Sequence, residues 1–73
     1  MQTTDIMLHI DEQLESKQQQ ILENDVRKLE GVIAPRFNRP HLFLVSYNPE
    51  KVKSLELLNF VTARGYNCQL VGM

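Results

Sequence analysis

Two histidines are the side chains of this 73-residue chain with the clearest capacity for metal chemistry. His9 lies in a predicted strand, where side chains alternate between the two faces, so that it shares a face with Met7. His41 begins a later strand. Imidazole and thioether groups bind copper, and imidazole also binds zinc, but two histidines need at least one further ligand to form a metal site. We interpret His9 and His41 as separate surface residues, with a copper or zinc site that includes Met7 as the alternative.

Three carboxylates, Asp11, Glu12 and Glu15, lie in a polar, acidic connection after the first predicted strand. Carboxylates suit hard cations, but these three have neither the spacing nor the structural glycine of a calcium loop. We interpret them as solvated charge, with Glu15 also suited to the positive end of the helix that follows. Glu15 is therefore only a minor candidate for a metal ligand, and no metal or other cofactor is expected.

Cys68 is the only cysteine, which excludes an internal disulfide. A free cysteine usually packs as a small hydrophobic residue, and the pattern around Cys68 turns it inward. The chain has no Ser-His-Asp or Cys-His grouping and no glycine-rich phosphate loop. The sequence therefore does not predict an enzyme.

Arg36 and Arg39 make a predicted hairpin locally basic and are candidates for anion binding, although arginines at such a place usually protect the edge of a sheet. RNA recognition on a sheet needs exposed aromatic rings for base stacking. The aromatic residues of the middle strands are instead predicted to face the helices, namely Phe37, Phe43 and Tyr47. Together with a net charge of −1, this predicts that nucleic acid is not a partner.

Hydrophobic periodicity divides the chain into two halves with the same strand–helix–strand order. The predicted strands cover residues 6–11, 32–38, 41–47 and 67–71, and the predicted helices cover 16–30 and 54–64. Ser16 with Gln19 has the spacing of a capping box, and Ser54 is the expected cap of the second helix. Gly31 and Gly65 are expected to end the helices with positive φ.

Right-handed crossovers interleave the two halves into an α+β, ferredoxin-like βαββαβ sandwich. Its four-stranded antiparallel sheet carries both helices on one face, and Pro35 assigns its strand to an edge or a bulge. Hydrophobic content of 42% and charged content of 23% are typical of a folded protein, so we expect residues 1–73 to form a single domain. No membrane insertion is expected, and a cytoplasmic location is the default.

The sheet face opposite the helices, here called the open face, is predicted to expose an apolar strip. The strip consists of Met7, Leu42 and Leu44 with Val71 at its margin, and His9 lies beside it. Apolar patches on small proteins often mark interfaces. The open face is therefore the candidate interface for a protein partner or for a homodimer.

The second half of the chain resembles the heavy-metal-associated domain, the module of copper chaperones and of metal-pumping P-type ATPases. The resemblance is carried by Tyr47-Asn-Pro-Glu-Lys-Val52, by Leu57 and Val61, and by Gly65-Tyr-Asn-Cys-Gln-Leu-Val71. It covers nearly the whole chain, because the first predicted helix and Gly31 also match, and it implies the fold predicted above.

The metal loop of that family does not carry over to this chain. Family members bind Cu(I) or another soft ion through a Cys-x-x-Cys loop before the first helix. Counting back from Gly31 puts the two cysteine positions at about Glu15 and Gln18, and the loop contains no sulfur. Soft cations need thiolate or thioether ligands. We therefore expect a degenerate heavy-metal-associated-like domain that acts in protein interaction or regulation. The alternative is a metal-binding or metal-transport-associated protein with His, Met or carboxylate ligands.

Overall fold

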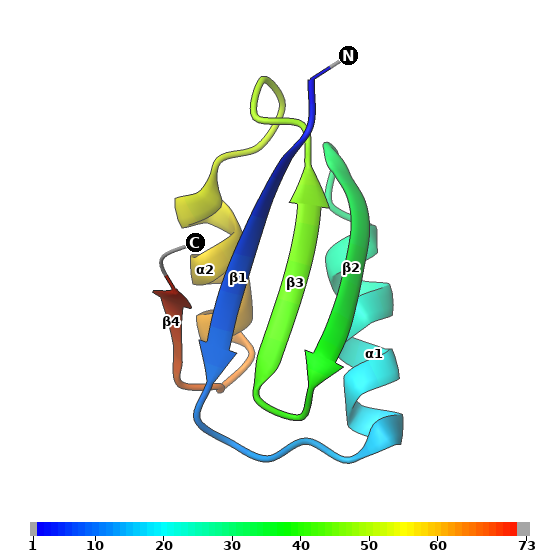
Figure 1. Cartoon of the computed structure of the whole chain (residues 1–73), viewed down its shortest axis with the longest axis vertical. Coiled ribbons are helices and arrows are strands. Elements are labelled where there is room, and N and C mark those ends of the chain that lie inside the picture. Colours follow the sequence, from blue (N-terminus) through cyan, green and yellow to red (C-terminus); the bar gives the residue numbers. More distant parts are fainter. Residues whose placement is uncertain (1, 72–73) are drawn as a thin grey trace.

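The computed structural model describes residues 2–71 and forms a four-stranded antiparallel sheet with both helices behind it (Figure 1). The elements are β1 (Thr4–Ile10), α1 (Ser16–Arg27), β2 (Val32–Arg39), β3 (Leu42–Tyr47), α2 (Ser54–Ala63) and β4 (Cys68–Val71). The strand order is β2-β3-β1-β4, so that β1 and β3 are central. The predicted α+β, ferredoxin-like βαββαβ fold is confirmed.

The core lies between the sheet and the helices. Strands and helices each contribute buried residues at the spacing that their own geometry sets. Every second residue of β3 is buried, as are Leu8 and Ile10 of β1, and both helices bury residues four apart. The fully buried side chains of these elements are Leu8, Ile10, Leu22, Val26, Phe43, Val45, Leu57 and Val61. The opposite face of the sheet carries no helix (Figure 1).

The connection between β1 and α1 was predicted to be polar, and this was wrong at Leu14. Its side chain is only 5% exposed and packs in the core. A single apolar residue among acidic neighbours has no periodicity, so no sequence pattern signalled its burial. Leu14 therefore anchors the loop that leads into α1.

The helix ends differ from the prediction by one to three residues. Glu15, rather than Ser16, is the N-cap of α1, and Gln18 takes the place predicted for Gln19. The helix ends at Arg27, and the chain turns over residues 28–30 before Gly31. Helix α2 begins after Lys53, and within residues 2–71 no side chain caps it, so the predicted Ser54 cap was wrong.

Strand β2 is an edge strand that is protected against further pairing. Pro35 has no backbone N–H to offer, and the N–H of Phe37 donates to the Glu23 carboxylate of α1 at 2.9 Å. The register with β3 is also irregular between Val32 and Ala34 and again after Phe37. The predicted edge position of the Pro35 strand is confirmed, and the edge has few groups left to pair with another strand.

None of the helices within residues 2–71 has the length and apolar character needed to cross a lipid bilayer.

Candidate functional site

Glu15 and Gln18, where counting back from Gly31 predicted the family's two cysteines, lie at the start of α1 and are joined by a hydrogen bond. The backbone N–H of Glu15 donates to Oε1 of Gln18 at 3.1 Å, which is half of a capping box. Both side chains are exposed. These positions therefore help to begin the helix, and their oxygen atoms are poor ligands for a soft cation.

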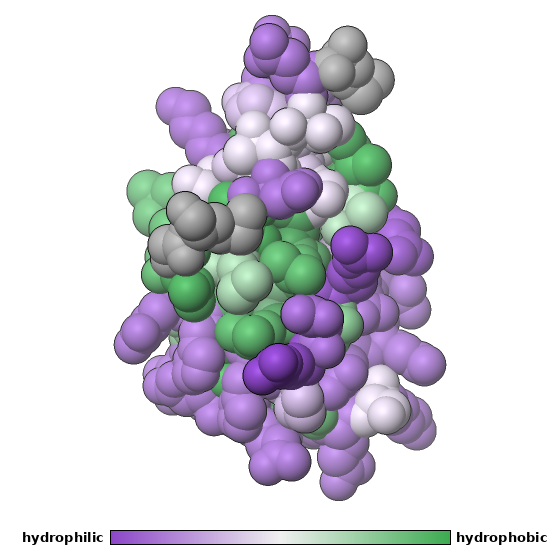
Figure 2. Space-filling view, viewed as in Figure 1, coloured by the Kyte–Doolittle hydropathy of each residue, from purple (hydrophilic) through white to green (hydrophobic). Residues whose placement is uncertain are grey.

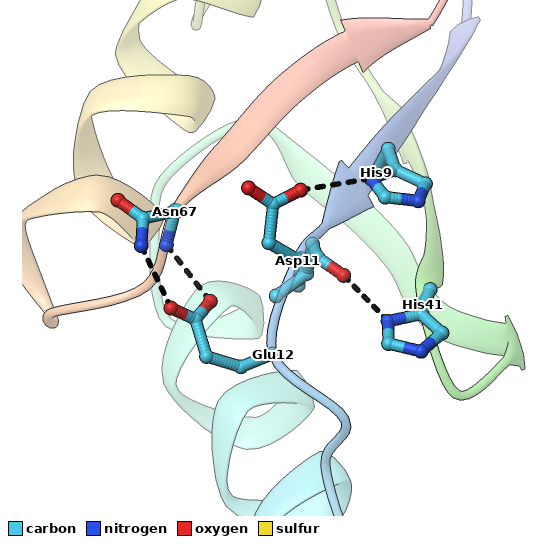
Figure 3. Close-up of polar contacts among 6 residues, drawn as sticks. His9, Asp11, Glu12, His41 and Asn67 are labelled. Atoms are coloured by element: carbon cyan, nitrogen blue, oxygen red, sulfur yellow. Dashed lines mark hydrogen bonds and ion pairs between the residues drawn. The ribbon is translucent and has the colours of Figure 1, made fainter.

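Three hydrogen bonds join the loop between β1 and α1 to the segment before β4, and Figure 3 shows the two that Glu12 accepts from Asn67. The Glu12 carboxylate accepts one bond from the backbone N–H of Asn67 and one from its Nδ2, both at 2.9 Å. The backbone N–H of Asp11 donates to the Asn67 carbonyl at 2.8 Å. The bond from the Asn67 backbone N–H is the main reason why the pKa of Glu12 lies below its ordinary value.

This contact predicts a pH dependence of stability. Because the folded-state pKa of Glu12 is lowered, its ionised carboxylate stabilises the fold above the ordinary glutamate pKa of about 4.3, and this contribution is lost as the pH falls through the lower, folded-state value. Glu12→Gln should therefore reduce the loss of unfolding free energy on acidification, measured by urea unfolding from neutral pH downward. Glu30→Gln, at an exposed turn position, is the control. Equal effects of the two substitutions would contradict the prediction.

The structure brings together the two histidines that were interpreted as separate. Their rings lie side by side, with centroids 5.8 Å apart and planes 13° from parallel (Figure 3). Nδ1 of His41 is 2.8 Å from the carbonyl of Ile10, and Nδ1 of His9 is 3.3 Å from Oδ1 of Asp11. The two rings meet because of the strand register and the position of the hairpin, and neither could be predicted from the sequence in this detail.

The other two candidate ligands do not complete a conventional metal site. Met7 lies two residues from His9 on the same strand face, opposite Leu44, and Glu15 is at the start of α1. Across residues 2–71, no three His, Cys, Asp or Glu side chains gather in a way that could hold a metal ion.

The strand register assembles the predicted apolar strip on the open face. Met7 pairs with Leu44 on one side and with Val71 on the other, and His9 pairs with Leu42. Met7, Leu42 and Leu44 are half-buried, and Val71 is more exposed. Figure 2 shows hydrophobic residues gathered in the middle of this face with polar residues around them.

The two arginines predicted to make the hairpin basic lie along this strip instead. Strand β2 continues to Arg39, and the register pairs Arg39 with Leu42 and Arg36 with Leu44. Paired residues share a sheet face, so both arginines border the open face. Arg36 was predicted within this strand, and Arg39 belongs to it because β2 is one residue longer than the sequence predicted.

Cys68 lies on the helix side of β4, paired with Ile10, and is partly buried. Its Sγ is 3.4 Å from the Thr62 hydroxyl and 3.7 Å from the Leu58 carbonyl. These contacts to α2 support the packing role predicted for the thiol.

We expect a bulky thiol reagent to label Cys68 slowly in the folded protein and rapidly in denaturant, because the helix restricts access to the sulfur. The control is a Cys68→Ala protein that also carries Asn59→Cys, which puts the thiol at an exposed position of α2. Native-state labelling of Cys68 as fast as that of the control would contradict the assignment.

A shallow pocket between the helices is lined by Ile21, Leu22, Ala63, Arg64 and Tyr66. The guanidinium group of Arg64 pairs with the Asp25 carboxylate and lies 5.5 Å from the centre of the Phe60 ring. Because the charge of this arginine is already balanced, the pocket is a poor site for an anion.

Comparison with solved structures finds the same fold in metal-binding proteins. The N-terminal domain of a potential copper-translocating P-type ATPase from Bacillus subtilis, in its Cu(I)-loaded state, is 25% identical, with 97% of this chain and 90% of that chain covered and a TM-score of 0.86. Oxidized MerP from Ralstonia metallidurans is 17% identical over 97% and 100% of the two chains, with a TM-score of 0.84. A copper-binding domain from another P-type ATPase is 13% identical over 93% of each chain, with a TM-score of 0.83.

No family model matches the chain, and no curated protein is significantly similar to it. The resemblance to heavy-metal-associated domains is nevertheless confirmed by these neighbours, and it is a resemblance of fold over nearly the whole chain. The chain is a small protein with the fold of metal-associated domains.

Proposed function

We propose that this chain is a non-catalytic protein-interaction module, cytoplasmic in location, that associates through the open face instead of carrying Cu(I) in the loop before α1. The main observation behind this proposal is the apolar strip across the two central strands. It lies on the face of the sheet away from the core, and such patches often mark interfaces. The loop before α1 also contains no sulfur atom, which argues against the binding of Cu(I) there.

The loop supports the first part of the proposal. Glu15 and Gln18 form a capping hydrogen bond at the start of α1. Leu14 is buried, and the Glu12 carboxylate is hydrogen-bonded to Asn67. The loop is therefore held by the fold's own contacts and does not need an ion to order it. Two solved neighbours are described as a copper-binding domain and a Cu(I)-loaded N-terminal domain of P-type ATPases, which agrees with a binding role.

The arrangement of the open face favours a second copy of this chain as the partner. A two-fold axis parallel to the strands, between β1 and β3, would lay Leu44 over the partner's Met7 and bring the two strips together. The same axis sets Arg36 and Arg39 of β2 against β4 of the other copy, away from the other copy's arginines. The molecule measures 33 × 23 Å across this face (Figure 1), so the contact would be smaller than the roughly 800 Å² per partner of standard interfaces and the dimer correspondingly weak.

Other modes of association are less well supported. Addition of a strand at β2 is hindered because Pro35 has no N–H and the N–H of Phe37 is bonded to Glu23. RNA stacking is disfavoured because Phe37 and Phe43 stack on each other on the helix side, with centroids 4.6 Å apart. These features favour contact through the open face over pairing at this edge.

The test is sedimentation equilibrium of the wild type and of Leu42→Lys with Leu44→Lys. Two lysines would put like charges across the two-fold axis, so we expect the dissociation constant of the dimer to rise by at least about tenfold, equivalent to about 1.4 kcal/mol. The matched control is Ile21→Lys with Leu55→Lys, which changes the charge equally at exposed positions of the helices and should leave association unchanged.

A wild type that stays monomeric at millimolar concentration would overturn the choice of a second copy, and so would equal weakening by the control. If the double variant fails to fold, NMR of the wild type still decides the question. On dilution, the amide shifts that change should belong to β1 and β3, and changes confined to the helices would contradict the proposal.

A further inference from the structure

We propose that His9 and His41 form a two-histidine site for a borderline divalent transition metal such as Cu(II) or Zn(II), at the end of the open face nearest the loop before α1. The site uses Nε2 of both imidazoles as ligands and leaves the remaining coordination positions to water. It is separate from the loop positions Glu15 and Gln18, and it does not depend on association of the chain.

The polar contacts of the two rings leave both Nε2 atoms available for this role. A backbone carbonyl can only accept a hydrogen bond, so the contact with Ile10 places the proton of neutral His41 on Nδ1. The Asp11 carboxylate lies 3.3 Å from Nδ1 of His9, where its negative charge favours a proton on that nitrogen. In both rings the lone pair is then on Nε2, and a carbonyl or carboxylate on the other nitrogen is the usual support of a metal-binding histidine.

The two rings are also placed so that one ion can contact both. The centroids are 5.8 Å apart and the planes nearly parallel, and Figure 3 shows both Nδ1 atoms turned toward their partners, with the Nε2 atoms free of drawn contacts. Metal–nitrogen distances of about 2.0–2.1 Å require the two Nε2 atoms to be about 3–4 Å apart. Because nearly parallel rings do not direct their lone pairs at one point, the His9 ring, whose side chain is 43% exposed, has to turn toward His41 when the ion binds.

The ligand chemistry sets the class of ion. Two imidazoles suit Zn(II), Cu(II) and Ni(II), and Cu(II) binds most tightly in the usual order of divalent ions. With no third protein ligand gathered nearby among residues 2–71, the site should exchange its ion readily.

The test is titration with CuCl2 alone and with ZnCl2 alone, carried out by calorimetry in a Cys68→Ala background so that the thiol cannot contribute. We expect one Cu(II) per chain, because both histidines hold the same ion. His9→Gln and His41→Gln should each lower the affinity by at least about tenfold. Independent histidines would instead give two equal sites, one of which would remain unchanged in each variant, and that result would overturn the proposal.

Asp11 tests the positioning of His9. Asp11→Ala frees Nδ1 of His9 and should weaken Cu(II) binding by about 10–100-fold, the usual cost of losing such a partner. Asp11→Asn keeps an oxygen that can accept the bond, and we expect it to retain most of the affinity. Equal losses in the two variants would overturn the positioning role of Asp11.

A measurement on the wild type covers the case in which a histidine variant is misfolded. Substoichiometric Cu(II) should broaden the NMR signals of both imidazole rings to the same extent, because the ion lies next to both. Broadening of one ring only, or of neither ring, would overturn the two-histidine site.

Discussion

Replacement of Gly31 by alanine is expected to lower the free energy of unfolding by about 3 kcal/mol, one of the largest effects available from a single methyl group in this chain. Gly31 has a φ of 97°, which costs a residue with a side chain about 1–2 kcal/mol. An added Cβ would also lie 2.8 Å from Cβ of Lys51 and 3.0 Å from Cγ1 of Val52. Overpacking of this kind costs about 1–3 kcal/mol.

The neighbours of Gly31 cannot easily move away. The Gly31 carbonyl accepts a 2.7 Å bond from the N–H of Asn48, and Val52 is part of the core. The Cβ of Lys51 is fixed to the backbone, so relief would have to shift the turn between β3 and α2. The clash therefore adds to the backbone cost and is not absorbed by a flexible side chain.

Gly65 provides a matched control, because it has the same φ of 97° but has nothing within 4 Å of an added Cβ. Gly65→Ala should cost only the backbone term of about 1–2 kcal/mol. Urea unfolding of both variants measures the difference directly. Equal destabilisation would show that the contact between Gly31 and the turn at residues 51–52 does not constrain the fold.

Cysteines placed at positions 15 and 18 are expected to convert a chain without a tight Cu(I) site into one that competes with a strong chelator. In Glu15→Cys with Gln18→Cys, two thiols would lie at the start of α1, where the helix lowers the pKa of a thiol and favours the thiolate. Thiolates are the ligands that Cu(I) prefers. Loss of the capping contact between Glu15 and Gln18 should cost about 1 kcal/mol of stability.

The control for this variant is Lys17→Cys with Gln20→Cys, which has the same spacing but lies within α1. Both pairs are tested in a Cys68→Ala background by chelator competition. We expect tight binding only for the pair at positions 15 and 18. Equally tight binding by both pairs would show that the helix start has no special role, and absence of binding by the first pair would contradict the assignment of the loop positions.

The fold could be predicted from the sequence because apolar residues recur in each element at the spacing typical of a strand or a helix. Leu8 and Ile10 alternate with residues of the open face, Leu57 and Val61 are four apart, and Gly31 has the positive φ predicted for it. These local patterns, combined with the handedness of crossovers, leave few arrangements. The open face followed from the same alternation, which is why Met7 and Leu44 were correctly assigned to it.

The details of the candidate sites depended on contacts that no local pattern encodes. The bond between Glu12 and Asn67 joins residues 55 apart, and the stacking of His9 with His41 depends on the exact register of two strands. A shift of one residue would put such side chains on opposite faces. Cap positions were also missed by one residue, because Glu15 and Ser16 can both accept a hydrogen bond at a helix start.

The most direct test of the account is a Cu(I) competition titration of the wild-type chain and of Cys68→Ala against a chromophoric chelator. The loop before α1 is held in place by Leu14, Glu12 and the Glu15–Gln18 contact, and it contains no sulfur ligand for a soft ion. We therefore predict that neither protein removes Cu(I) from the chelator. Tight binding that persists in Cys68→Ala and is lost when Glu15 and Gln18 are changed to alanine would contradict the account.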